Sequence, residues 1–137
     1  MARWLLPWPP SVNHMYARTA SGHVRLTDEA RAYREEVIVR VRQSSQPAPD
    51  LTGPLRVEVV LWGRAGRWDI DNPLKAAMDA LFLALGSDDS GVCELEVVKF
   101  IGGGERVVEV RLSEALMLPD GLVPTLPSIG GEEVMEG

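Results

Sequence analysis

The sequence predicts a single α+β domain in which a mixed β-sheet is covered by two main helices. Residues 55–62 alternate apolar and polar side chains, as a strand with one buried face does. Residues 28–42 and 74–85 instead repeat apolar side chains at helical spacing. The chain of 137 residues has the length of one domain.

In the first half of the chain, residues 3–6 predict a short strand that ends at the three prolines between positions 7 and 10. The glycine-containing stretch 18–25 predicts a hairpin or a mobile tip. Thr27 is the expected N-cap of the first helix, because acidic residues follow it in the first turn, where the helix dipole favours them. A linker at 44–53 precedes the alternating strand.

In the second half, residues 92–101 and 106–112 are rich in β-formers and flank the glycines at 102–104, which predicts a β-hairpin. We therefore expect residues 1–112 to form the folded domain. Residues 113–137 hold five acidic residues and no basic one, and we expect them to be an acidic, disordered tail.

The charge and cysteine content restrict the class of protein. The net charge of −6 argues at first against a nucleic-acid partner, but residues 1–67 hold ten arginines against six acidic residues, which is compatible with phosphate binding. One cysteine excludes an internal disulfide framework, and with only two histidines the sequence argues against a zinc site. With no long apolar run and no signal peptide, we expect a cytoplasmic protein.

Two carboxylates stand two residues apart at Asp69 and Asp71. In an extended segment such residues share a face, so we expect both to point the same way and Ile70 to point into the core. Paired hard oxygen ligands of this kind suit Mg²⁺ or Mn²⁺. A solvated loop before a helix is the alternative, and the spacing alone does not decide between them.

The second helix is expected to begin with Asn72 as N-cap and Pro73 at its first position. Lys75 then lies in the first turn and places an ammonium beside the two carboxylates. Gly86 is the expected C′ residue. The acidic turn 87–91 follows one helix length later; it could fold back to complete an acidic cluster, or it could simply be solvated.

Basic and aromatic side chains near this stretch are candidate DNA contacts. Arg64 and Arg67 flank the acidic segment on a glycine-containing turn, and we expect them to contact phosphates. Asn13 and His14 lie in an aromatic-containing loop whose rings could stack on bases. The alternative is that this loop only packs against the sheet.

The chain resembles the RusA-type Holliday-junction resolvases (crossover junction endodeoxyribonucleases), small enzymes of bacteria and their prophages, over residues 4–112. Four blocks carry the resemblance: LPWPPSVN at 6–13, LTDEARAYREEV at 26–37, RWDIDNPLKAAMDAL at 67–81 and SDDSGVCELEVVK at 87–99. The third block is the most specific, because it joins a D-x-D-N motif to a lysine and an A-A-x-D-A-L helix.

The resemblance implies a homodimer that cuts four-way DNA junctions symmetrically, with Mg²⁺ (or Mn²⁺) as cofactor. Its metal ligands would be Asp69, Asp71 and Asp89, and its catalytic lysine Lys75; local spacing does not separate Asp89 from Asp88. A non-cutting DNA-binding or assembly module and a Ca²⁺-stabilised structural domain are the alternatives. An apolar dimer patch could include Val60 and Trp62, or Phe100, although these residues could instead cover the monomer's own helices.

Overall fold

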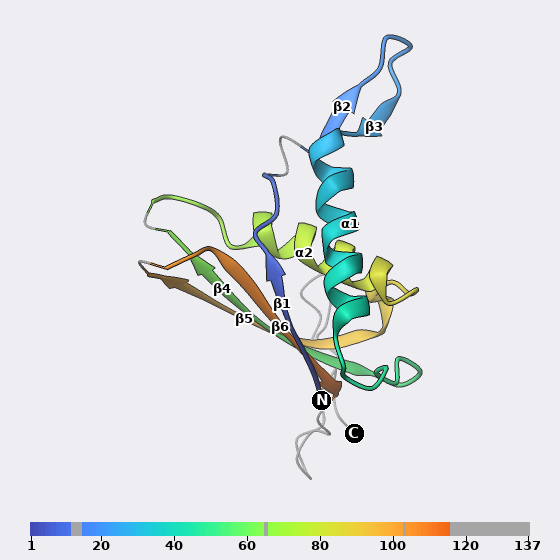
Figure 1. Ribbon diagram of the computed structural model, residues 1–137, viewed down its shortest axis with the longest axis vertical. Coiled ribbons are helices and arrows are strands. Elements are labelled where there is room, and N and C mark those ends of the chain that lie inside the picture. Colours follow the sequence, from blue (N-terminus) through green and yellow to red (C-terminus); the bar gives the residue numbers. More distant parts are fainter. Residues whose placement is uncertain (12–14, 65, 103, 116–137) are drawn as a thin grey trace, which may run out of the picture.

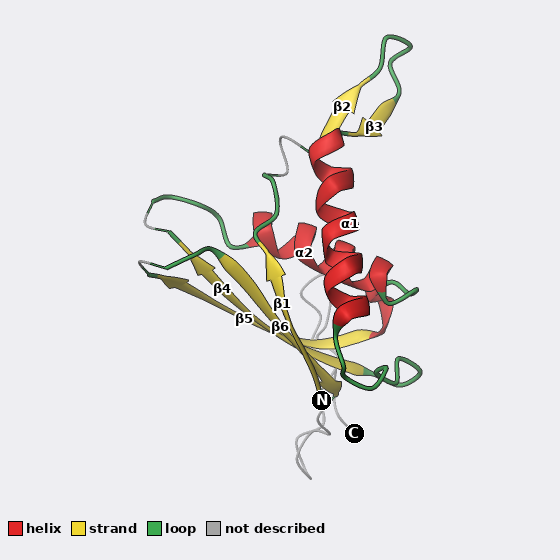
Figure 2. Ribbon diagram, viewed as in Figure 1, coloured by secondary structure: helices red, strands yellow, loops and turns green. Residues whose placement is uncertain are grey.

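The computed structural model describes residues 1–11, 15–64, 66–102 and 104–115. In this part of the chain, a mixed four-stranded sheet is covered on one face by two helices, which confirms the α+β class (Figures 1 and 2). The elements are β1 (Ala2–Pro7), β2 (Tyr16–Arg18), β3 (Val24–Leu26), α1 (Asp28–Gln43), β4 (Leu55–Gly63), α2 (Asp71–Ala84), the 3₁₀ turn η2 (Asp89–Gly91), β5 (Val92–Ile101) and β6 (Val107–Glu114).

The strand order of the sheet is β1-β6-β4-β5. β4 pairs antiparallel with β6 and parallel with β5. The parallel pair is possible because α2 carries the chain back between the two strands, as a parallel connection requires. The short strands β2 and β3 form a separate hairpin that projects beyond the start of α1 (Figure 1).

The hairpin expected from residues 92–101 and 106–112 is wrong, because β4 lies between β5 and β6. The connecting loop crosses the end of β4, where the Gly102 amide donates to the Gly63 carbonyl at 3.1 Å. A loop of this length spans two strand spacings, about 10 Å.

The core lies between the sheet and the helices. The alternation expected for residues 55–62 is confirmed: Leu55, Val57, Val59 and Leu61 are all less than 4% exposed. They share one cluster with side chains of both helices and of β1 and β6. Among the described residues, no helix is long and apolar enough to span a membrane.

Two of the three helix ends that the sequence marks are confirmed. The Thr27 hydroxyl accepts a hydrogen bond from the Ala30 amide at 3.2 Å and caps α1. At the end of α2, Gly86 has φ +72°, and the amides of Gly86 and Ser87 donate to the carbonyls of Leu83 and Phe82 at 3.0 and 2.9 Å. These two bonds form a Schellman motif, which needs a left-handed residue at C′.

The last strand runs two residues beyond the domain end expected at residue 112. β6 runs to Glu114, and the Ala115 amide donates to the Pro54 carbonyl at 2.9 Å. Residues 116–137, which hold most of the predicted tail, lie outside the described residues.

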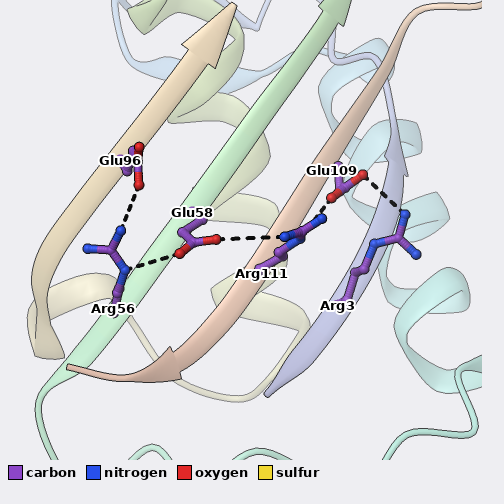
Figure 3. A network of polar contacts seen from close by, with 6 residues as sticks. All are labelled: Arg3, Arg56, Glu58, Glu96, Glu109 and Arg111. Carbon is purple, nitrogen blue, oxygen red and sulfur yellow. Dashed lines mark hydrogen bonds and ion pairs between the residues drawn. The ribbon is translucent and has the colours of Figure 1, made fainter. Parts of the chain in front are cut away.

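The face of the sheet away from the helices carries a ladder of ion pairs across all four strands (Figure 3). Arg56 contacts Glu58, Glu94 and Glu96 at 3.2, 3.0 and 2.6 Å. Arg111 and Arg3 both bind Glu109, at 2.9 and 3.1 Å. Nearer the end of β4, Trp62 stacks on Phe100 with ring centroids 4.9 Å apart. One half of this open face is therefore charged and the other half is apolar.

Acid should weaken this ladder at Glu109. The hydrogen bond from Arg3 holds the pKa of Glu109 below its ordinary value of 4.5, against the opposing effect of burial. A lowered carboxyl pKa stabilises the fold above the ordinary value, and the stabilisation is lost as the pH falls through the folded-state pKa. We expect Glu109→Gln to lower Tm at pH 7 and to flatten the fall of Tm between about pH 5 and pH 3. The exposed Glu105→Gln is the control, and an unchanged acid profile in Glu109→Gln would contradict the prediction.

Candidate functional site

The acidic segment between β4 and α2 is attached to the sheet by Trp68. The Trp68 indole N–H donates to the Arg64 carbonyl at 3.1 Å, which closes the loop on itself. Lys99 of β5 donates to the Trp68 carbonyl at 2.8 Å, and its ammonium lies 4.1 Å from the centroid of the indole ring. Trp8 meets the same ring edge-on at a centroid distance of 5.1 Å. Contacts from the β1 and β5 ends therefore position the residue next to Asp69.

Gly63 leaves room for this indole. A Cβ added at Gly63 would lie 2.3 Å from Cζ2 of Trp68, far inside van der Waals contact. We expect Gly63→Ala to lower the free energy of unfolding by about 1–3 kcal/mol, the usual cost of overpacking. Urea unfolding measures this, with Gly53→Ala as control, since a Cβ there meets nothing within 4 Å. Equal stability of the two variants would show that the Trp68 contact is not tight.

The start of α2 differs from the expected one. The helix begins at Asp71, and its N-cap Ile70 already has helical dihedrals, φ −64° and ψ −35°. Asn72 and Pro73 are therefore the second and third helical residues; proline is tolerated there because first-turn amides have no intrahelical partner. Ile70 is 38% exposed and does not point into the core. Because the segment is not extended, alternation no longer places Asp69 and Asp71 on one face.

The carboxylates of Asp69 and Asp71 are exposed, and neither makes a hydrogen bond or ion pair with the described residues. Asp71 lies in the first turn of α2, where the helix dipole favours a negative charge. Asp69 borders an open hollow of about 650 Å³, which is also lined by Trp8, Arg67, Trp68 and Arg106. Free carboxylates thus lie beside cationic and aromatic side chains.

The second acidic position, Asp88 and Asp89, follows the C-terminal end of α2, whereas Asp69 and Asp71 lie at its N-terminal end. Asp88 accepts hydrogen bonds from the Ser90 amide, at 3.0 Å, and from the Ser90 hydroxyl; these bonds, the hydroxyl's above all, lower the pKa of Asp88. Asp89 is exposed and lines a smaller hollow of about 180 Å³ together with Asp79. Asp79 follows Asp71 by eight residues, which is about 12 Å along the helix. Since Asp89 lies beside Asp79, the helix separates Asp89 from Asp71 by about that distance or more.

The turn at 87–91 therefore does not fold back to complete a cluster with Asp69 and Asp71. In the described part of the chain, no three His, Cys, Asp or Glu side chains are grouped closely enough to hold a metal ion. A single chain brings Asp69 beside Arg67 and Arg106, and it places Asp89 beside Asp79 in a different hollow.

Lys75 also differs from the expectation. Its ammonium pairs with Asp79 at 3.6 Å, one turn further along the helix, and its side chain is 71% exposed. A lysine and an acid four residues apart are neighbours on a helix surface, which explains the pair. The lysine therefore contacts neither Asp69 nor Asp71, although an exposed pair of this kind breaks at little cost.

Among the predicted DNA contacts, Arg67 lines the larger hollow and Arg64 is exposed. Asn13 and His14 lie outside the described residues. The sequence reasoning missed Arg106, whose guanidinium lies 5.7 Å from the Trp8 ring centroid, and Lys99. Neither cation stands next to the acidic segment in the sequence; both reach the site because β5 ends and β6 begins at the end of the sheet where β4 ends.

Comparison with known families agrees with the residues gathered here. The model of the endodeoxyribonuclease RusA family matches residues 7–113, which include β4, α2, η2 and both acidic positions. A search of curated proteins finds no significant match. The family comprises endodeoxyribonucleases that act on Holliday junctions. Since the match spans most of the 137 residues, the chain belongs to the RusA endodeoxyribonuclease family.

Proposed function

We propose that this protein resolves four-way DNA junctions by Mg²⁺-dependent hydrolysis, with paired symmetric cuts made by a homodimer. Asp69, Asp71 and Asp89 are the proposed metal ligands, and Lys75 is the proposed catalytic lysine. The observation that carries the proposal is the free carboxylate of Asp69 beside a hollow lined by Arg67 and Arg106, two residues before the free carboxylate of Asp71, in a chain of this family.

The donor set fits the metal. Carboxylate oxygens are hard ligands, and Mg²⁺ in nucleic-acid enzymes is commonly bound by one or two carboxylates together with phosphate oxygens. A bound divalent ion would activate a water and stabilise the leaving oxygen. Exposed carboxylates that have no partner among the described residues are available for this role.

The cations of the chain bind and orient the substrate in this proposal. Arg67 and Arg106 line the hollow next to Asp69 and contact backbone phosphates. Lys75 leaves its exposed pair with Asp79 and turns toward the phosphate, where its charge stabilises the negative charge that develops during hydrolysis.

Asp89 is preferred to Asp88 for a structural reason. The carboxylate of Asp88 is used locally, because it accepts two hydrogen bonds from Ser90 and caps η2. The carboxylate of Asp89 makes no hydrogen bond or ion pair with the described residues. Asp88→Asn should therefore cut junctions far better than Asp89→Asn.

The separation of the acidic positions supports a two-subunit site. Since α2 keeps Asp71 and Asp89 about 12 Å or more apart, they cannot share one ion within a chain. A two-fold dimer in which each copy supplies Asp89 to the other would build two equivalent sites. Two such sites match two cuts in opposing strands.

The proposal is tested with synthetic four-way junctions. The protein should cut the junction in Mg²⁺, leave it intact in EDTA, and leave a linear duplex of the same arm sequences uncut. Cutting that persists in chelator would overturn the metal dependence. Tight junction binding without cutting in either Mg²⁺ or Mn²⁺ would instead favour the non-cutting module.

A further inference from the structure

The β2–β3 hairpin projects away from the sheet, beyond the start of α1 (Figure 1). None of residues 16–25 is buried, and Tyr16 and Val24 are 46% and 61% exposed. A two-stranded hairpin by itself is at best marginally stable in water. This hairpin therefore depends on bonds at its tip and its base, and it leaves both of its faces open to a partner.

Hydrogen bonds hold the tip of the hairpin in one shape. The Thr19 amide donates to the His23 carbonyl at 2.7 Å, and the Gly22 amide donates to the Thr19 carbonyl at 2.9 Å. The Thr19 hydroxyl also accepts a hydrogen bond from the His23 amide at 3.2 Å. Gly22 has φ +85°, which glycine adopts without strain. Because the tip is already ordered, binding does not have to order it first.

The base of the hairpin is attached to the helix that carries the proposed site. Met15 is 3% exposed and packs with Ala30 of α1 and Ala76 of α2. The Thr27 amide, at the other side of the base, donates to the Met15 carbonyl at 2.9 Å. Ala76 lies in the second turn of α2, which begins at Asp71. The hairpin therefore holds a set position relative to a proposed metal ligand.

The hairpin carries positive charge in an acidic chain. Residues 1–27 contain three arginines and no acidic residue, although the net charge of the chain is −6. Arg18 and Arg25, the two arginines of the hairpin, are exposed, and neither side chain makes a hydrogen bond or ion pair with the described residues. Arg18 lies opposite Val24 and Arg25 lies opposite Ala17, so the two arginines are on opposite faces of the hairpin.

We propose that the β2–β3 hairpin enters the major groove of one duplex arm of the junction, where Arg18 and Arg25 contact guanine. This inference rests on the proposed function for its substrate, four-way DNA, and adds a contact that reads sequence at a distance from the cut. The hairpin would thereby determine the sequences at which the protein prefers to act.

The dimensions and the chemistry of the hairpin fit this groove. The major groove is about 12 Å wide and about 8.5 Å deep, and it admits a two-stranded β-ribbon. The strand from Tyr16 to Ala20 extends about 13 Å, which is enough to reach the base edges. Arginine pairs with the N7 and O6 atoms of guanine, the commonest specific contact in this groove. Arginines on both faces can reach base edges on both sides of the hairpin.

Duplex DNA is the occupant because it satisfies both arginines. A charged group that is buried without a partner is costly, so an apolar protein surface would disfavour Arg18 and Arg25. The hairpin itself has no acidic residue to pair with them. DNA supplies guanine acceptors and phosphates on both sides of the groove.

Methylation interference tests the contact with the full chain in EDTA, so that binding is measured without cutting. A synthetic four-way junction is methylated sparsely with dimethyl sulfate, and bound and free molecules are separated on a native gel. Methylation of guanine N7 within an arm should reduce binding by the unmodified protein. Arg18→Ala and Arg25→Ala should each lose part of this interference and bind unmethylated junctions about 10-fold or more weakly.

Arg42→Ala is the matched control. Arg42 is exposed, makes no ion pair with the described residues, and lies in the last turn of α1, about 20 Å along the helix from the end beside the hairpin. Its replacement removes the same charge and should change neither the affinity nor the interference pattern. An equal loss of affinity in Arg42→Ala would show that only the total charge matters and would overturn the proposal.

Three further results would overturn the contact. They are interference only at adenine N3, which lies in the minor groove; no interference at guanine N7; and an unchanged pattern in both Arg18→Ala and Arg25→Ala. Cutting in Mg²⁺ is a separate readout. A protein that shows the expected interference but does not cut would retain the hairpin contact and contradict only the proposed function, whereas a protein that cuts without this interference would contradict only the hairpin contact.

Discussion

Asp71→Asn protein is expected to bind four-way junctions as tightly as the unmodified protein, or more tightly, and to cut them at least about 100-fold more slowly. Loss of a direct metal ligand should exceed the 10–100-fold effect of removing an outer-shell partner. Binding should not weaken, because a negative charge near DNA phosphates is removed. Asp69→Asn should behave in the same way. Single-turnover cleavage in Mg²⁺ and junction titration measure the two effects.

Asp28→Asn is a matched control for this change. Asp28 is the first residue of α1, as Asp71 is the first residue of α2, so both substitutions remove a favourable charge at a helix N-terminus. Only Asp71 belongs to the proposed metal site. Near-normal cutting by both Asp69→Asn and Asp71→Asn would remove the basis of the assignment, and equal losses in Asp28→Asn and Asp71→Asn would point to helix stability instead.

Mixing two inactive variants should restore activity. Asp71→Asn and Asp89→Asn dimers each lack a ligand at both sites. If each site takes Asp71 from one subunit and Asp89 from the other, a hybrid dimer has one site without either ligand and one intact site. With random exchange, half of the dimers are hybrids, so nicking should recover to roughly a quarter of the unmodified rate. The product should be singly nicked junctions, seen on denaturing gels with each strand labelled in turn.

A mixture of Asp69→Asn and Asp71→Asn is the control for this experiment. These two residues lie on the same side of the proposed site, so neither site of their hybrid is intact and no activity should return. If the Asp71→Asn and Asp89→Asn mixture also stays inactive, although subunit exchange is demonstrated by mass, each chain must complete its own site.

The sequence by itself determined where most of the helices and strands lie and to which family the chain belongs. Alternation over residues 55–62 predicted β4 and its buried face, and Thr27 and Gly86 marked helix ends where the structure has them. These signals are readable because burial periodicity and capping bonds join residues close together in the chain. The motif blocks also led to the family, since they hold the residue types together with their spacing.

Only the tertiary structure decided which strands became neighbours and where the site residues lie. β5 and β6 look like a hairpin locally, but β4 lies between them, because strand pairing is a competition among all strands for the same hydrogen bonds. The same order brings Lys99 and Arg106 to Trp68 and Trp8. It also leaves Asp89 at the far end of α2 from Asp71. No local pattern encodes these distances, because they depend on contacts between segments far apart in the sequence.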